Sequence, residues 1–258
     1  MSDHRTPPKP QPRSVSQKDG DLARPPIRTL DRMALLAHQL VTPLSTISAL
    51  AQGLMRRAEN LRPEDVRDRG EKIWRASRRL QELIETIMSY TRANAGAITP
   101  NPAPFNLRSM AQRVCREQNL QQPCRAMCVT VDGLPDMFVG DPILLEQALV
   151  IVLSNAMKYS PVERPITVVG TADEHEVRIG VRDQGIGVPE RDLPFLMQPF
   201  FRASNARHLP GTGLGLSLVR HILQLHGGSA RIESTEGEGT TITLAMPRLE
   251  ADDRGSGI

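Results

Sequence analysis

The chain has 258 residues, of which 39% are hydrophobic, 24% charged and 3% aromatic. That length allows one large domain or two small ones with a sizeable core, and the composition is ordinary for a globular protein. The net charge of +3 is a small excess, and no basic patch interleaved with aromatic residues occurs in the sequence. Nucleic acid is therefore not expected as a partner.

The sequence offers no disulfide framework, zinc site or membrane segment. Its three cysteines lack a paired C-x-x-C spacing. No apolar run approaches the ~20 residues of a membrane span, and the polar, Pro-rich N-terminus lacks the hydrophobic segment of a secretory signal. We expect a cytoplasmic protein with reduced thiols. Residues 1–28 and 249–258 are expected to be disordered tails, because they contain little to bury.

An apolar heptad pattern follows the N-terminal tail. One seam position holds Leu30, Ala37, Leu44, Ala51 and Ala58, and the other holds Met33, Leu40, Ile47, Leu54 and Leu61. Pro63 suits the first turn of a second helix, whose seam begins at Val66 and whose outer face is rich in arginine. We expect residues 29–95 to form a helical hairpin. Two helices cannot enclose a core, so the seam predicts a homodimeric four-helix bundle. The alternative is that the seam packs on the C-terminal part of the same chain.

The second half of the sequence has a different texture. Residues 96–105 are rich in Pro, Ala and Asn and are expected to be a linker. Helical stretches and β-branched runs then intermix without regular β-α-β alternation, which favours an α+β domain at 106–248 with a mixed sheet. The helical stretches are 106–121, 142–158 and 213–226, and the β-branched runs are 126–131, 165–171, 176–182, 229–234 and 240–246.

Two short motifs in this domain carry polar residues suited to a ligand. In "LSNAMKYSP", Asn155 offers an amide oxygen of the kind that Mg²⁺ accepts, and Lys158, one turn on, can meet a phosphate. Asn155 is equally explained as a packing residue. In "VRDQGIGVP", Asp183 can accept a hydrogen bond from an exocyclic amine, and the glycines Gly185 and Gly187 let the backbone approach a flat ligand. Alone, this motif is more often a plain turn.

Two further motifs are glycine-rich. In "GTGLGLSLV" a turn opens into a helix, where backbone N–H groups can bind an anion. Its spacing is not that of a P-loop, and its context is not that of a dinucleotide fold. In "EGEGTTITLAMP" a glycine turn leads into a strand, and Thr241 is expected to place its hydroxyl near Asp183. Taken alone, this last motif is better explained by a plain hairpin.

The order of these four motifs resembles the ATP-binding domain of bacterial sensor histidine kinases. This Bergerat fold is shared with gyrase-type, mismatch-repair and heat-shock chaperone ATPases, and the resemblance covers roughly 104–248. It implies ATP and Mg²⁺ as cofactors, with Asn155 as the metal ligand. The implied nucleotide-binding residues are Asn155, Lys158, Tyr159, Asp183, Gly185, Gly187, Arg202, Gly211, Gly213, Leu214, Gly215 and Thr241. Between the motifs, "PFLMQPFFRASNARHLP" resembles the family's phenylalanine box and mobile ATP lid, with Arg202 near a phosphate.

The hairpin resembles the dimerisation and phosphotransfer domain of the same family. The family pattern H-E-x-x-[TN]-P-L aligns with His38, Gln39, Thr42, Pro43 and Leu44, which makes His38 the phospho-accepting residue. The heptad places His38 beside the seam, toward solvent. Gln39 replaces the usual acidic residue, which suggests a slower kinase, and Thr42 implies phosphatase activity. Ile151 stands where many relatives have a further asparagine, so the metal shell is expected to be thinner.

The resemblance implies an autophosphorylating protein histidine kinase of a two-component system. It would pass phosphate from His38 to an aspartate of a response regulator receiver domain. The alternative is a catalytically weak dimeric adaptor that docks a partner through the hairpin. A gyrase-like ATPase is disfavoured, because it predicts no histidine hairpin.

Overall fold

The computed structural model describes residues 29–57, 61–94, 98–209 and 211–248, and it does not describe the side chains of His38 and Gln39. The expected disordered tails therefore lie outside the described residues. None of the described helices is long and apolar enough to cross a membrane.

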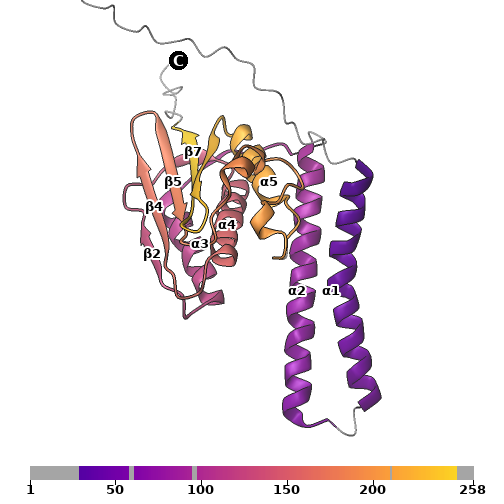
Figure 1. Cartoon of the computed structure of the whole chain (residues 1–258). Helices are drawn as coiled ribbons and strands as arrows, with labels where there is room; N and C mark the ends of the chain where they lie inside the picture. Colours follow the sequence, from indigo (N-terminus) through magenta and orange to yellow (C-terminus); the bar gives the residue numbers. More distant parts are fainter. Residues whose placement is uncertain (1–28, 58–60, 95–97, 210, 249–258) are drawn as a thin grey trace, which may run out of the picture.

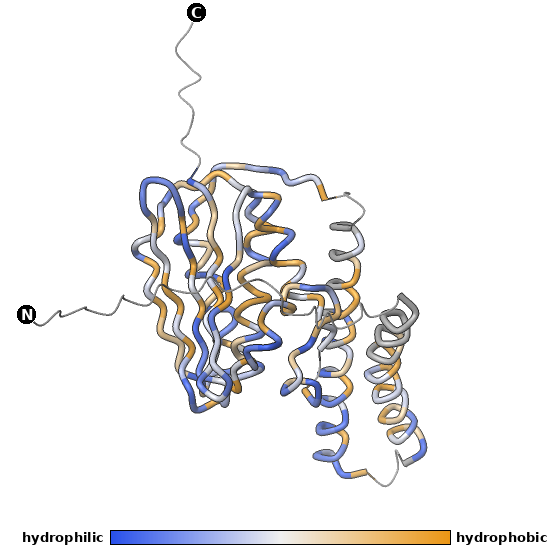
Figure 2. The backbone as a smooth tube through the Cα atoms, turned by 45° about the horizontal axis from the view of Figure 1, so that its top comes forward, coloured by the Kyte–Doolittle hydropathy of each residue, from blue (hydrophilic) through white to orange (hydrophobic). Residues whose placement is uncertain are grey.

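Two long helices run side by side and form an antiparallel hairpin (Figure 1). Helix α1 spans Thr29–Arg57 and helix α2 spans Pro63–Asn94. As predicted, α2 begins at Pro63, where a missing N–H costs nothing, and Glu64 and Asp65 lie in its first turn. Hydrophilic residues dominate the half of α2 nearest the connection to α1 (Figure 2).

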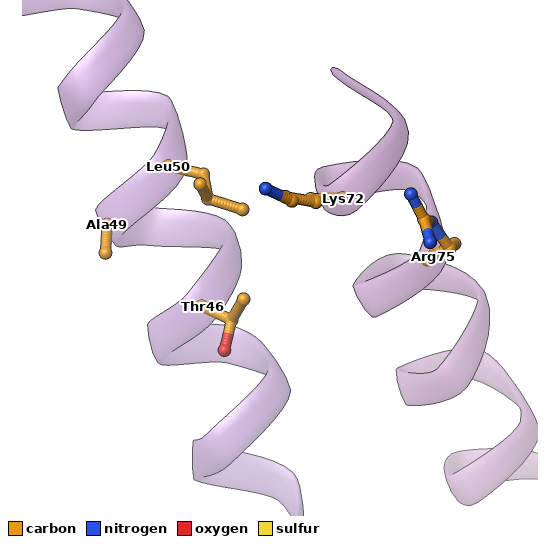
Figure 3. Close-up of a pocket in the computed structure, with 5 residues that line it drawn as sticks. All are labelled: Thr46, Ala49, Leu50, Lys72 and Arg75. Carbon is orange, nitrogen blue, oxygen red and sulfur yellow. The ribbon is translucent and has the colours of Figure 1, made fainter. Parts of the chain in front are cut away.

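The hairpin has little core of its own. Among its described side chains, Pro43 inside α1 is the one that is buried. Leu40 and Ile47, at one seam position, are half-buried, whereas Ala37 and Leu44, at the other, are exposed. Between the helices lies an open groove of about 540 Å³, lined by Thr46, Ala49, Leu50, Lys72 and Arg75 (Figure 3). Part of the predicted seam, at Ala37 and Leu44, thus has no cover within one chain.

The rest of the chain forms an α+β domain with a mixed sheet of five strands, as predicted. The sheet order is β2-β4-β5-β7-β6, with the β2–β4 pair parallel and the other pairs antiparallel. The strands are β2 (Met127–Thr130), β4 (Ile166–Ala172), β5 (Glu176–Arg182), β6 (Ser229–Thr235) and β7 (Gly239–Pro247). Helices α3 (Leu107–Gln121), α4 (Pro142–Tyr159) and α5 (Gly215–Leu225) cover one face of the sheet (Figure 1). The short helices η2 (Glu190–Phe195) and η3 (Ser204–Ala206) lie between β5 and α5 in the chain.

Alternation along the strands builds the core on the helical side of the sheet. Every second residue of β5, namely Val177, Ile179 and Val181, is buried, and β7 repeats this pattern. Leu149 of α4 and Ile222 of α5 are both fully buried on the helical side. The sheet's other face is left without a helix, so polar residues alternate with the buried ones.

The expected linker ends in a strand rather than remaining irregular throughout. Residues Ala103–Phe105 form β1, which pairs antiparallel with β3 (Phe138–Gly140). Just before it, the N–H of Asn101 donates to Asp141 Oδ2 at 2.9 Å. The N–H of Asp141 in turn donates to Nε2 of His226, at the end of α5, at 2.9 Å. Strands of three residues are too short for their periodicity to be recognised.

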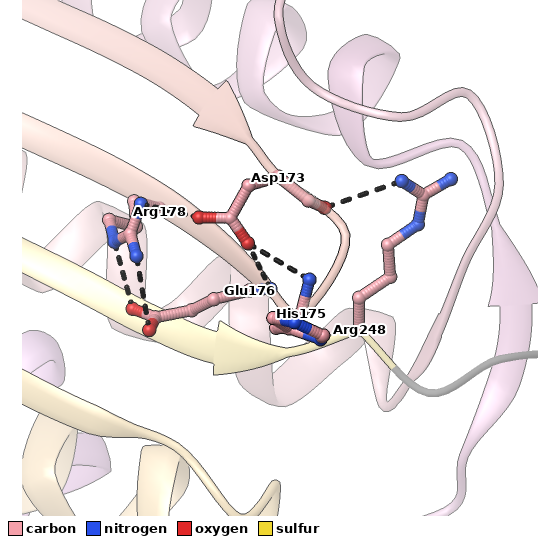
Figure 4. A network of polar contacts seen from close by, with 5 residues as sticks. All are labelled: Asp173, His175, Glu176, Arg178 and Arg248. Atoms are coloured by element: carbon pink, nitrogen blue, oxygen red, sulfur yellow. Dashed lines mark hydrogen bonds and ion pairs between the residues drawn. The ribbon is translucent and has the colours of Figure 1, made fainter.

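A polar network closes the β4–β5 turn (Figure 4). Arg178 forms ion pairs with Asp173 and Glu176, each at 3.0 Å. Asp173 Oδ1 accepts the backbone N–H groups of His175 and Glu176, and the N–H of Arg248 donates to the His175 carbonyl at 2.8 Å. This network lies at the start of β5, whereas the D-x-G-x-G motif follows its other end.

Candidate functional site

The end of α4 supplies the first candidate side chains. Asp141 caps the start of the helix, and its Oδ1 accepts the N–H groups of Ile143 and Leu144. Its apolar face is buried, which fixes the rotation of the last turns. Asn155 and Lys158 are therefore both presented half-buried at the C-terminal end. Lys158 Nζ donates to the Tyr159 hydroxyl at 3.0 Å and lies 4.5 Å from the centre of its ring.

Asp183 follows β5 and lies 7% exposed below the sheet edge. Its N–H donates to the Thr240 carbonyl at 2.9 Å, and its Oδ1 accepts the N–H of Gly185 at 2.8 Å. Burial raises the pKa of this carboxyl, opposed by the hydrogen bonds that it accepts from the backbones of Gly185 and Thr240 and by the positive charge of Arg125. A buried carboxylate with spare lone pairs can accept a hydrogen bond from a ligand amine.

The D-x-G-x-G turn lies directly against the end of α4. The N–H of Ile186 donates to the Tyr159 carbonyl at 3.1 Å. A Cβ on Gly185 would lie 2.2 Å from the same carbonyl oxygen, so a side chain is excluded there. On the other side, Asn205 Nδ2 donates to the Gly187 carbonyl at 3.1 Å. The turn is thus held between α4 and the segment that follows η2.

The glycine-rich turn that begins at Gly211 lies next to Lys158. A Cβ placed on Gly211 would lie 2.6 Å from Lys158 Nζ, so this cation stands next to the turn that precedes α5. Leu214 is fully buried and anchors the start of the helix, and its N–H donates to Thr212 Oγ1 at 3.2 Å. Gly215 is the first residue of α5. Three segments far apart in the sequence therefore meet at one end of the sheet.

The phenylalanine-rich segment is packed against this turn. The rings of Phe195 and Phe201 lie 5.5 Å apart, and Phe200 is buried with a φ of 66°. The N–H of Phe200 donates to the carbonyl of Gly213 at 2.9 Å. Gly213 has a φ of +73°, a conformation that favours glycine. One end of the expected lid is thus fastened to the glycine turn.

Arg202 lies in the same segment but is turned toward its own backbone. Its Nη2 donates to the carbonyl of Ala206 at 2.6 Å and to that of Leu209. A contact between Arg202 and a phosphate, as predicted, requires the side chain to leave these carbonyls. Its Nε is buried and has no partner among the described residues.

The register of β5 and β7 corrects the expectation for Thr241. Thr241 lies opposite Arg182, and because side chains alternate along a strand, both project from the face that the helices leave bare. Asp183 comes next and projects toward the helices, together with Thr240. The Thr240 hydroxyl lies 2.9 Å from Ser234 Oγ. Thr240 is therefore the threonine beside Asp183, because a shift of one residue reverses the face.

Sequence reasoning also missed a buried acid that braces the lid segment. Asp192 in η2 is 1% exposed, and its Oδ2 accepts the N–H and the hydroxyl of Ser204 in η3, at 2.6 and 2.7 Å. These bonds join the two short helices that frame the phenylalanines. No periodicity marks Asp192, since 3₁₀ turns of this length have none.

In the hairpin, the structure describes the surroundings of His38 but not its side chain. The predicted orientation of His38 and Gln39 toward solvent lies outside the described side chains. Thr42, one turn after His38, is exposed, and its carbonyl accepts the Thr46 hydroxyl at 3.0 Å. Pro43 lies inside α1 and lacks the N–H that would bond to the Gln39 carbonyl.

Two protein families match this arrangement. The "His Kinase A (phospho-acceptor) domain" matches residues 31–96, and the "Histidine kinase-, DNA gyrase B-, and HSP90-like ATPase" family matches residues 140–250. The chain therefore belongs to the histidine kinase family.

Among curated relatives, the sensor-like histidine kinase SenX3 of Mycolicibacterium smegmatis is 31% identical over 220 residues, or 84% of this chain and 57% of SenX3. The circadian input-output histidine kinase CikA of Synechococcus elongatus is 31% identical over 223 residues, covering 83% of this chain and 29% of CikA. The chain thus spans less than two thirds of the length of each of these relatives.

Solved structures agree on the fold. The mycobacterial sensor histidine kinase MprB is 29% identical with a TM-score of 0.52, covering 57% of this chain and 98% of that one. The Acinetobacter baumannii histidine kinase AdeS has a TM-score of 0.63 at 17% identity, covering 83% of this chain and 98% of that one. Histidine kinase ThkA, solved in complex with response regulator protein TrrA, has a TM-score of 0.61 at 20% identity and covers 84% of this chain and 61% of that one. At these last two identities the likeness concerns the fold alone.

Proposed function

We propose that this chain is an ATP-dependent protein histidine kinase that phosphorylates itself on His38. It then passes the phosphoryl group to an aspartate of a response regulator receiver domain. The observation that carries the proposal is the meeting of three segments at one sheet end: the end of α4, the Asp183 turn and the start of α5. They share a chain with a helical hairpin that matches the phospho-acceptor family. Because ATP is the donor, the proposed reaction belongs in the cytoplasm.

In this proposal each segment binds one part of the nucleotide. The Asp183 carboxylate accepts the exocyclic amine of adenine. Lys158 and the backbone N–H groups at the start of α5 hold the phosphates. The described residues contain no group of three or more His, Cys, Asp or Glu side chains that could hold a metal alone. If Mg²⁺ is bound together with the phosphates, the Asn155 amide oxygen would be its ligand from the protein. Such an ion neutralises phosphate charge and orients the transferred group.

His38 supplies the nucleophile. A neutral imidazole ring can attack phosphorus without a strong base. A nitrogen–phosphorus bond forms, the bond between the γ-phosphorus and its bridging oxygen breaks, ADP leaves, and the ring gives up its N–H proton. Gln39 can orient the ring but cannot take that proton. Thr42, which is exposed, would serve the reverse role of dephosphorylating the regulator.

The hairpin supplies the proposed dimer interface and docking surface. Ala37 and Leu44 belong to the apolar seam yet are exposed in one chain, and the open groove between α1 and α2 lies between the same helices (Figure 3). Helices of a second copy would cover both and complete a four-helix bundle. The receiver domain would dock on the remaining outer faces. That histidine kinase ThkA was solved in complex with response regulator protein TrrA supports a partner of this kind.

The test is incubation of the purified protein with ATP labelled at the γ-phosphate. We expect label on the wild type that is lost in acid and stable in alkali, and no label on His38→Ala. His175→Ala is the matched control, since His175 is an exposed histidine in the β4–β5 turn. An unlabelled wild type would favour the adaptor, and a labelled His38→Ala would remove His38 from its role.

A further inference from the structure

Arg125, in the loop before β2, is a buried arginine that uses every N–H of its guanidinium. It is 3% exposed. Its Nη2 donates to the carbonyls of Met157 and Ser160 at 3.0 and 2.9 Å. Its Nη1 donates to the carbonyls of Pro161 and Arg164 at 2.9 and 3.2 Å. Its Nε donates to Gln122 Oε1 at 2.9 Å. Five donors thus meet five acceptors, the full capacity of this side chain.

Four of these acceptors belong to the end of α4 and the turn after it. The last carbonyls of a helix have no partner within the helix, and they carry the negative end of its dipole. Arg125 supplies both hydrogen bonds and a positive charge to that end. The same last turns present Asn155 and Lys158, the candidates for the metal and phosphate half of the site.

The clamped end of α4 is also the support of the Asp183 turn. Tyr159, whose carbonyl accepts the Ile186 N–H at 3.1 Å, lies between Met157 and Ser160 in the chain. Gly185 packs against the same carbonyl and donates its N–H to Asp183 Oδ1 at 2.8 Å. A continuous series of contacts therefore leads from Arg125 through Tyr159 and Gly185 to Asp183.

Charge adds to this geometry. Arg125 acts on Asp183 through its positive charge, which favours the ionised carboxylate. Burial lowers the pKa of Arg125 itself, opposed by the charges of Glu163 and Asp183. A lysine could supply the charge but has three donors instead of five and no planar fork.

We propose that Arg125 is a positioning residue of the nucleotide site. It holds the end of α4 and the Asp183 turn in the one spacing that lets adenine and phosphates bind together. It touches no ligand, and the inference rests on the proposed ATP site.

The experiment compares Arg125→Lys and Arg125→Met with the wild type in the full chain. The control is Arg178→Met, which removes an exposed arginine with three side-chain hydrogen bonds near the start of β5 (Figure 4). Autophosphorylation is measured against ATP concentration, and amide hydrogen exchange is measured at Ile186 and along β7. We expect Arg125→Lys to raise KM for ATP about tenfold with kcat changed less than about twofold. We also expect exchange at Ile186 to speed up more than exchange in β7.

Each outcome decides something. A purely structural role lowers the active fraction, so kcat falls while KM stays, and exchange rises at Ile186 and β7 alike; that result overturns the inference. An unchanged KM with unchanged exchange overturns it as well. If Arg125→Met does not fold, Arg125→Lys carries the test. If the wild type itself does not use ATP, the proposed function fails, and exchange at Ile186 still decides whether Arg125 holds the turn.

Discussion

The hairpin and the α+β domain differ in how completely each covers its apolar side chains. In the α+β domain, three helices and one sheet face enclose fully buried residues such as Leu149 and Ile222. In the hairpin, Val66, Ile84 and Met88 are more than two fifths exposed. The α+β domain can thus position its own site by internal packing, whereas the hairpin is an incomplete bundle. This difference predicts that changes in the two regions will fail in different ways.

The largest effect is expected from placing a charge in the hairpin seam. Ile73→Asp puts a carboxylate where an apolar residue is half-buried in a single chain and would be enclosed in the dimer. We expect complete loss of the dimer by light scattering and of His38 labelling, with ATP affinity of the α+β domain unchanged within about twofold. Arg67→Asp, at an exposed position of α2, is the control. A dimer that survives Ile73→Asp would contradict the four-helix bundle.

A cavity in the α+β core should act through stability instead. Leu149 is fully buried, so Leu149→Ala should lower the free energy of unfolding by about 2–5 kcal/mol, measured by urea denaturation. Leu120 is 77% exposed, and Leu120→Ala should change it by less than about 0.5 kcal/mol. Oligomeric state should remain unchanged in both. Equal costs for the two substitutions would contradict the described core.

Asp183→Asn should weaken ATP binding without loosening the fold. A hydrogen bond to a charged group contributes about 1.5–3 kcal/mol, so the dissociation constant should rise about 10- to 100-fold. Asp192→Asn, a second buried acid outside the proposed adenine contact, is the comparison. Equal losses in both variants would indicate general damage to the domain.

Asp183 should make both ATP affinity and folding stability depend on pH, with opposite signs. Burial raises the pKa of Asp183, so its protonation on acidification begins above the range of an ordinary aspartate. ATP affinity should fall as pH is lowered through that raised pKa, because the protonated form loses an acceptor. The contribution of Asp183 to stability runs the other way: it is present below the ordinary aspartate pKa and is lost as pH rises through the raised one. Asp183→Asn should remove both dependences, seen by titration calorimetry and thermal melts.

The smallest effect is expected at Gln39. Gln39→Glu introduces a carboxylate next to His38 that can take the proton released during phosphoryl transfer. A positioned general base raises a reaction rate about 100-fold or more. Because Gln39 can already orient the His38 ring, we expect a gain of about tenfold in the autophosphorylation rate. Gln52→Glu, at an exposed position between three and four turns further along α1, should have no effect. A slower Gln39→Glu variant would exclude proton transfer at this position.

Periodicity predicted much of the fold, because it depends on local rules. The heptads of α1 and α2 and the alternation along β5 and β7 repeat often enough to be read from one sequence. The β1–β3 pair escaped detection, because strands of three residues give no repeat. The prediction that Thr241 lies beside Asp183 was wrong by one position. A glycine turn shows where a strand starts but does not show which of its residues face the helices.

Contacts between distant segments could not be predicted. Asp183 and Lys158 were found because glycines or a helix end mark them in the sequence. Arg125 meets carbonyls more than 30 residues away, and nothing near it in the chain indicates that meeting. Arg202 was expected to face a ligand, whereas its Nη2 donates to two carbonyls of its own segment.

The tie between Asn101 and Asp141 makes α4 a mechanical element. Asp141 caps the start of that helix and also holds the chain that arrives from the hairpin, while Asn155 and Lys158 stand near its far end. A helix of 18 residues is a stiff rod ~27 Å long. We therefore expect a pull or twist exerted by the hairpin on Asn101 to enter this rod at one end and to reach the proposed nucleotide site at the other.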